Sequence, residues 1–94
     1  MMTKKLDDLI DVEVRDGLPA RFRWRERIFV IQQIVMYWID VEPWWQHDFE
    51  HDVTWHIWRV EAQFSSQSVI LDVAYRDSLL SGNAFPWRIV RVFD

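Results

Sequence analysis

The sequence predicts a mainly β protein: a single small domain, an antiparallel meander of five to six strands curled into a sheet or an open SH3-like barrel. Three observations support this prediction. Apolar and polar residues alternate in several short segments, as on half-buried strands. Turn-forming residues separate these segments. The 94 residues are 50% hydrophobic and 16% aromatic with only two Gly and three Pro, which suits a dense core and excludes a disordered or collagen-like chain.

A chain of this length suits one domain, because single domains mostly run about 50–250 residues. We expect a flexible N-terminus over residues 1–8 and a single β domain over residues 9–94. No internal repeat or low-complexity stretch divides the chain further.

The first predicted strands are bounded by turns. Residues 10–14 alternate between Ile or Val and charged side chains, and an Asp-Gly pair at residues 16–17 then breaks the strand. Residues 21–25 alternate between Arg and aromatic side chains, so one face is basic and the other apolar. A turn at residues 26–27 is expected to join this strand to the next as a hairpin.

The segment over residues 28–39 fits two kinds of element. It is uncharged and rich in Ile, Val and aromatic residues, which favours a pleated strand. Four of its residues also fall on one face of a helix: Ile28, Ile31, Val35 and Trp38. We expect a long, bent strand and keep a short helix over residues 32–38 as the alternative.

Three further strands are predicted over residues 55–63, 69–75 and 87–93. Each combines β-branched and aromatic residues with a period of two. A Ser-rich turn at residues 65–68 joins the first to the second, and a polar loop at residues 77–83 precedes the last.

The net charge of −4 is unevenly distributed. Residues 21–27 carry four Arg and one Glu, whereas residues 40–52 carry five acidic residues and no Lys or Arg. The chain as a whole lacks the positive field typical of nucleic-acid-binding domains.

The basic strand is nevertheless the candidate nucleic-acid site. Alternate side chains on a strand lie about 7 Å apart on one face, and interleaved aromatic rings can stack on bases. The candidate residues are Arg21, Arg23, Arg25 and Arg27. The other interpretation is that these charges protect an edge strand against pairing with other chains.

The loop over residues 42–53 contains a tandem Trp pair and acidic residues. Adjacent residues of an extended segment point to opposite sides, so we expect one Trp to face the core and the other to face solvent. An exposed Trp is a candidate anchor for a protein partner. The predicted partner-binding residues are Trp44, Trp45, Asp48, Glu50 and Asp52.

The same loop contains an H-x-x-E-H pattern, formed by His47, Glu50 and His51, which is also found in one class of zinc peptidases. Such a site needs a helix to bring both His onto one face, whereas Pro43 and the tandem Trp favour a loop. We therefore expect a solvated acidic loop with no metal and no other cofactor; a metal held by the two His is the alternative.

Other catalytic signatures are missing from the sequence. The absence of Cys excludes thiol catalysis, two isolated Gly residues cannot form a phosphate-binding loop, and no Gly-x-Ser-x-Gly motif occurs. We expect a protein that is not an enzyme.

Hydropathy predicts a cytoplasmic chain without membrane association. The first ten residues lack the apolar stretch of a signal peptide. The longest uncharged run spans residues 28–39, which is shorter than the roughly 20 apolar residues that cross a bilayer.

Five motifs follow one another in a recognisable order: Arg-Phe-Arg-Trp-Arg at 21–25, the tandem Trp at 44–45, Trp-Arg-Val-Glu-Ala at 58–62, Tyr-Arg-Asp at 75–77 and Trp-Arg-Ile-Val-Arg-Val-Phe-Asp at 87–94. In these motifs the sequence resembles a family of small, mainly actinobacterial proteins, DUF6504, over about residues 20–94. A similar tandem Trp and aromatic-Asp ending occurs in inactive Y-family polymerase relatives that act in translesion synthesis. The chain departs from the family pattern in having Glu26 where Gly is expected and in its acidic, His-containing loop.

The resemblance implies an interaction module that works beside an error-prone polymerase assembly. We therefore expect a non-enzymatic, protein-binding β domain that assists DNA damage tolerance or translesion synthesis. The alternative is a single-stranded nucleic-acid-binding domain that uses the strand over residues 21–27. The identity of the partner and the oligomeric state are left open.

Comparing Trp44→Ala with Trp45→Ala tests the expectation for the tandem pair. Replacing the inward Trp should cost roughly 3–5 kcal/mol of stability, because truncating a buried aromatic leaves a cavity. Replacing the outward Trp should leave the melting temperature nearly unchanged. Equal losses in thermal melts would place both rings in the core and remove this partner site.

Overall fold

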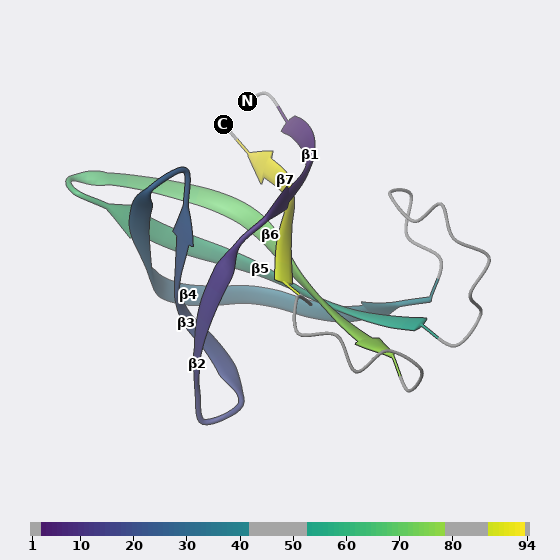
Figure 1. The fold of residues 1–94 in the computed structure, drawn as a ribbon. Coiled ribbons are helices and arrows are strands. Elements are labelled where there is room, and N and C mark those ends of the chain that lie inside the picture. The colour runs from purple at the N-terminus through teal and green to yellow at the C-terminus, as the bar shows by residue number, and fades with distance from the viewer. Residues whose placement is uncertain (1–2, 42–52, 79–86, 94) are drawn as a thin grey trace.

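The computed structural model describes residues 3–41, 53–78 and 87–93 (Figure 1). These residues form seven strands, β1 (Thr3–Leu9), β2 (Asp11–Arg15), β3 (Leu18–Trp24), β4 (Arg27–Asp40), β5 (Val53–Phe64), β6 (Gln67–Ser78) and β7 (Trp87–Phe93). They make one antiparallel sheet in the order β1-β7-β6-β5-β4-β3-β2. The predicted mainly β, single-domain class is confirmed, and no helix occurs in the described part of the chain.

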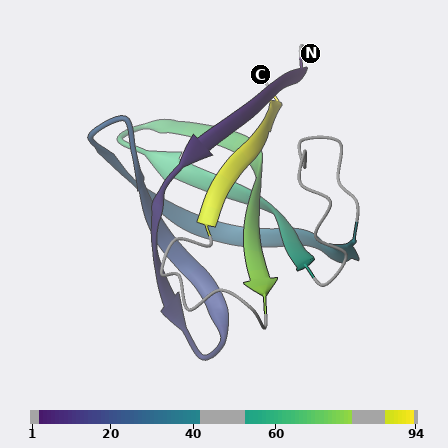
Figure 2. The ribbon, with the colours of Figure 1, turned by 45° about the vertical axis from the view of Figure 1, so that its right-hand side comes forward.

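The sheet curls because its two edge strands are consecutive in the chain. Only Ile10 separates β1, which pairs with β7, from β2, which pairs with β3. Ile10 is buried, and its backbone N–H donates to the carbonyl of Trp87 over 3.3 Å. The Trp24 indole N–H donates to Asp8 over 3.0 Å and so joins β3 to β1. The purple N-terminal segment accordingly runs from β7 across to β3 (Figure 2).

The structure differs from expectation at the N-terminus and in strand number. Residues 1–8 were expected to be flexible, but Thr3–Leu9 pair with β7 as β1, which brings the number of strands to seven rather than five or six. Leu6 packs against the core, and Arg88 Nη1 donates to an Asp7 carboxylate oxygen over 2.7 Å. The apolar signal in this strand is weak because Leu6 is its one side chain that packs on the core.

The main core fills the inside of the curled sheet. Phe22 and Phe29 stack there with ring centroids 5.1 Å apart, and alternate residues of the other strands surround them. The buried members are Ile10, Phe22, Phe29, Val60, Ala62, Leu71, Val73, Ile89 and Val92. This placement matches the predicted inward face of the strand containing Phe22.

A second, smaller core lies on the outer face of the same sheet. Trp55, Ile57, Ala74 and Val90 are almost completely buried, with Trp38 packed against them. The middle strands β5, β6 and β7 are therefore apolar on both faces, as is typical of strands in the centre of a packed structure.

The segment with two interpretations is a strand. The alternative of a short helix over residues 32–38 is wrong, since these residues lie within β4 and pair with β5. The pairing register shifts between Ile31 and Gln33 and again between Ile34 and Met36. Each such bulge inserts one extra residue, so inward-facing residues are locally three apart and imitate a helical period.

Within the described ranges, two-residue turns connect consecutive strands at residues 16–17, 25–26 and 65–66. In the second turn, Arg25 and Glu26 have φ angles of 52° and 62°, and Trp24 pairs directly with Arg27. Two positive φ values are characteristic of the type I′ turn that suits hairpin twist. The turn predicted at residues 26–27 therefore lies one residue earlier. Its position is not evident from the sequence, because neither Arg25 nor Glu26 is the Gly or Asn that usually marks such a turn.

Glu26→Gly should stabilise the protein. A left-handed conformation costs an L-residue about 1 kcal/mol or more, whereas Gly adopts it freely. After the larger unfolded-state entropy of Gly is subtracted, we expect a gain of about 0.5 kcal/mol, measured as a higher melting temperature. Glu26→Ala is the matched control, since it removes the charge but keeps the Cβ. An equal gain from Glu26→Ala would contradict a backbone origin.

Candidate interaction surface

The four Arg side chains of the predicted nucleic-acid site do not form one row. Arg21 and Arg23 lie on the outer, exposed side of β3, Arg25 belongs to the following turn, and Arg27 starts β4. Because Arg27 pairs with Trp24, it lies on the same face of the sheet as that inward-facing ring. The alternation expected for a single strand therefore ends after Arg23.

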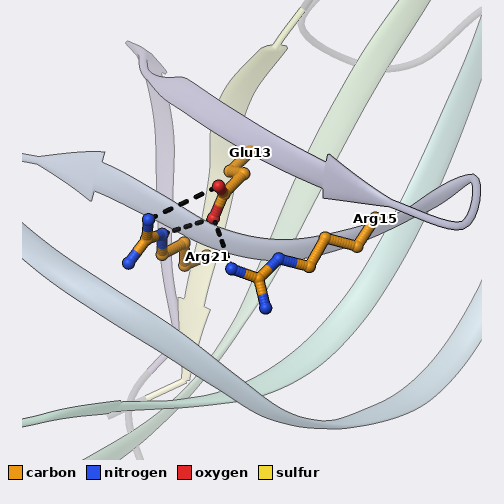
Figure 3. A network of polar contacts seen from close by, with 3 residues as sticks. All are labelled: Glu13, Arg15 and Arg21. Atoms are coloured by element: carbon orange, nitrogen blue, oxygen red, sulfur yellow. Dashed lines mark hydrogen bonds and ion pairs between the residues drawn. The ribbon is translucent and has the colours of Figure 1, made fainter.

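Carboxylates of neighbouring strands accompany these cations. Arg21 forms an ion pair with Glu13, and Arg15 approaches the same carboxylate from the other side, with Nη2 3.6 Å from Oε2 (Figure 3). Asp11 pairs with Arg23 in the β2–β3 register. The positive charge that the sequence concentrates on β3 is thus opposed by acidic residues of β2.

The remaining two Arg contact aromatic rings. The Arg25 guanidinium carbon lies 4.4 Å from the Trp24 ring centroid, and Arg25 Nη2 lies 3.7 Å from an Asp8 oxygen. The Arg27 guanidinium carbon lies 5.1 Å from the Phe64 ring centroid. The edge-protection interpretation is wrong, because β3 is not an edge strand: it pairs with β2 on one side and with β4 on the other. Binding of single-stranded nucleic acid here stays a prediction.

The predicted partner-binding loop lies outside the described residues. This applies to Trp44, Trp45, Asp48, Glu50 and Asp52, and equally to His47 and His51 of the H-x-x-E-H pattern. Among residues 3–41, 53–78 and 87–93, no group of three or more His, Asp or Glu side chains is placed to hold a metal ion. No helix in these ranges is long and apolar enough to span a membrane.

A row of aromatic side chains crosses four strands on the inner face. The Tyr37 hydroxyl on β4 and Nδ1 of His56 on β5 share a hydrogen bond of 2.6 Å. The ring centroids of Tyr37 and Trp58 lie 4.8 Å apart. Trp58 in turn contacts Trp87 of β7 at 5.3 Å, and Trp87 contacts Tyr75 of β6 at 5.1 Å. Tyr37 is the exposed end of this row.

On the outer face, a buried ion pair joins β5 to β6. Arg59 donates from Nε and Nη2 to the two carboxylate oxygens of Asp72, over 2.9 and 3.1 Å. Asp72 is 1% exposed, and the Arg59 guanidinium lies against the rings of Phe93 and Trp38. The hydrogen bond with Asp72 raises the pKa of Arg59, while partial burial acts in the opposite direction.

Exposed apolar side chains are concentrated on β4 in the described part of the chain. Ten large hydrophobic side chains are exposed among the described residues, and most belong to this strand or to the residue after it. These are Ile28, Val30, Val35, Met36, Tyr37, Ile39 and Val41. Single exposed apolar side chains are normal on a protein surface, whereas several along one strand make that strand a candidate interaction site.

Comparison with known proteins identifies the family of the chain. The family described as "Domain of unknown function (DUF6504)" matches residues 1–94. The chain belongs to the DUF6504 family. No curated protein and no solved structure matches the chain.

The DUF6504 motifs that fall on described residues are mainly structural. The motif at 21–25 supplies Phe22 and Trp24 to the inner core, and the motif at 58–62 contributes Val60 and Ala62. They are therefore signatures of the fold. Glu26, the departure from the family pattern, occupies a backbone position with positive φ, which is where Gly is favoured.

Sequence reasoning missed two features of this DUF6504 domain. The pair of Arg59 and Asp72 depends on the β5–β6 register, which hydropathy does not specify. The exposed surface of β4 was hidden in an apolar segment that looks like core. The absence of charge over residues 28–39 was the signal available for an unprotected strand.

Breaking the buried ion pair should destabilise the domain strongly. Arg59→Met leaves the Asp72 carboxylate buried without its partner, so we expect a loss of about 3 kcal/mol in urea denaturation. Adding Asp72→Leu should recover most of it, because no buried charge then remains. Arg21→Met is the control, since its half-exposed ion pair with Glu13 is worth at most about 1 kcal/mol. Equal losses from Arg59→Met and Arg21→Met would contradict the role of burial.

Proposed function

We propose that this DUF6504 domain is a non-enzymatic protein-interaction module that assists an error-prone polymerase assembly in the cytoplasm. The observation that carries the proposal is the exposed apolar surface of β4. Water contact with such a surface is unfavourable, and burial against a partner returns roughly 25 cal/mol for each Å² removed from water.

The contrast between polar and apolar side chains supports binding through β4. Several charged groups on the sheet are paired within the chain, as Glu13 is with Arg21, Asp72 with Arg59 and Asp7 with Arg88. The apolar side chains of β4 from Val35 to Ile39 include four that are about half exposed. These charged groups thus have partners within the chain, whereas the exposed apolar side chains of β4 are available to another protein.

The link to DNA damage tolerance comes from the sequence resemblance. The tandem Trp and the aromatic-Asp ending are similar to the end of inactive Y-family polymerase relatives that act in translesion synthesis, and the family resembled is mainly actinobacterial. A partner within that assembly is therefore the one to seek first. Trp44 and Trp45 are the proposed second anchor, with Asp48, Glu50 and Asp52 beside them to attract a basic partner.

Affinity capture from the native host tests this function. The tagged domain should recover replication or repair polymerases, identified by mass spectrometry. Met36→Lys should reduce that recovery, since it places a charge in the apolar surface, whereas Leu9→Lys should not, because Leu9 is similarly exposed but lies on β1. Recovery of metabolic enzymes alone, or equal recovery of polymerases by both variants, would count against the proposal.

A further inference from the structure

One edge of β4 lacks a pairing strand over much of its length among the described residues. β5 pairs with β4 from Val30 to Asp40. On the opposite edge, β3 reaches only residues 27–30 of β4. Among the described residues, no strand pairs with this edge from Ile31 to Ile39. Figure 1 shows β4 continuing well past the β2–β3 hairpin.

From Met36 to Ile39, the free edge lacks the usual protection against pairing. Natural edges are blunted by Lys, Pro or bulges, but residues 28–39 contain no charged residue and no Pro. The two bulges of β4 end before Met36, and the residues from Met36 to Asp40 pair regularly with β5. The second half of β4 thus offers a regular pairing template.

Both faces of the sheet are apolar along this edge. Tyr37 and Ile39 lie on the inner face, opposite Trp58 and His56, whereas Met36 lies on the outer face opposite Arg59. The relevant side chains are 46–61% exposed: Val35, Met36, Tyr37, Ile39 and Val41. A ligand lying on one face would leave the other in water. A strand added at the edge places its own side chains beside those of both faces at once.

We propose that a second copy of this chain adds its β4 to this edge, antiparallel and about a two-fold axis near Trp38, so that the two sheets join. The proposal rests on the proposed use of β4 as an interaction surface and goes beyond it in making a second copy of the chain the occupant of the free edge. Two-fold symmetry is the commonest arrangement of protein oligomers, and it requires a self-complementary patch. An uncharged, apolar strand meets that requirement.

The cross-strand pairs around this axis are favourable. Tyr37 lies opposite the partner's Ile39, an aromatic and β-branched pair of the kind that stabilises antiparallel strands. Met36 lies opposite the partner's Asp40, so no like charges meet. A charged segment of another protein would find no opposite charge on this edge between residues 28 and 39, which favours the identical chain as the occupant.

Sedimentation equilibrium of the purified chain tests the proposal. The unmodified protein should be a dimer in the micromolar range. The double variant Tyr37→Lys/Ile39→Lys should raise the dissociation constant at least about tenfold, because like charges meet at two positions across the axis. Leu9→Lys/Ile28→Lys is the matched control; it changes two equally exposed apolar residues outside the free edge and should leave the dimer intact.

A charge-swap experiment identifies the surface. The variants Tyr37→Lys/Ile39→Lys and Tyr37→Glu/Ile39→Glu should each be monomeric, and mixing them should restore a dimer of one copy of each. Circular dichroism melts establish that both variants are folded. A monomeric unmodified chain, or a mixture that fails to pair, would overturn the proposal.

The outcome is separable from that of the proposed function. A monomer that still captures polymerases through β4 removes self-pairing and keeps the interaction module, with a foreign strand as the occupant. A dimer that breaks on Tyr37→Lys/Ile39→Lys but captures no polymerase keeps self-pairing and removes the role in damage tolerance.

Discussion

The attachment of the N-terminal segment to both ends of the sheet is the constraint on which the rest of the structure depends. β1 hydrogen-bonds to β7 and β2 to β3, with Ile10 alone between them. A chain that short can reach both edges only if the sheet curls. Curling gives the sheet an inside, and the aromatic rings of Phe22, Phe29 and Phe64 fill it next to the aliphatic residues of β5–β7.

A difference in strand length leaves part of β4 unpaired by β3. Strands β4, β5 and β6 have 12 to 14 residues, whereas β3 has seven. β3 therefore covers one end of β4 and leaves the other end as an edge. The buried pair of Arg59 and Asp72 and the row of Tyr37, Trp58 and Trp87 hold the long strands together in this half. The unpaired edge is thus presented by a well-packed part of the sheet, which suits a binding surface.

Much of the fold follows from local rules, whereas the site depends on pairing. Asp16-Gly17 predicts its turn, and alternation correctly turns Phe22 inward and Arg23 outward. Alternation alone places Arg21 in a row of unpaired Arg side chains. Its ion pair with Glu13 depends on the β2–β3 register, which the distance between the two residues in the sequence does not reveal. Likewise β1 was missed, since it is held by long-range contacts such as that between Asp7 and Arg88.

Pairing of β1 with β7 also has a consequence for how the chain folds. Thr3 is the register partner of Phe93, so β1 cannot pair before β7 is present. The β2–β3–β4 and β5–β6 hairpins need only nearby residues and can form early, but closure requires contacts across nearly the whole sequence, which are slow to find. On a ribosome, the sheet stays open until β7 has emerged. During that interval β1 has no partner strand and the apolar edge of β4 is already made, which is when a nascent chain most needs protection from its neighbours.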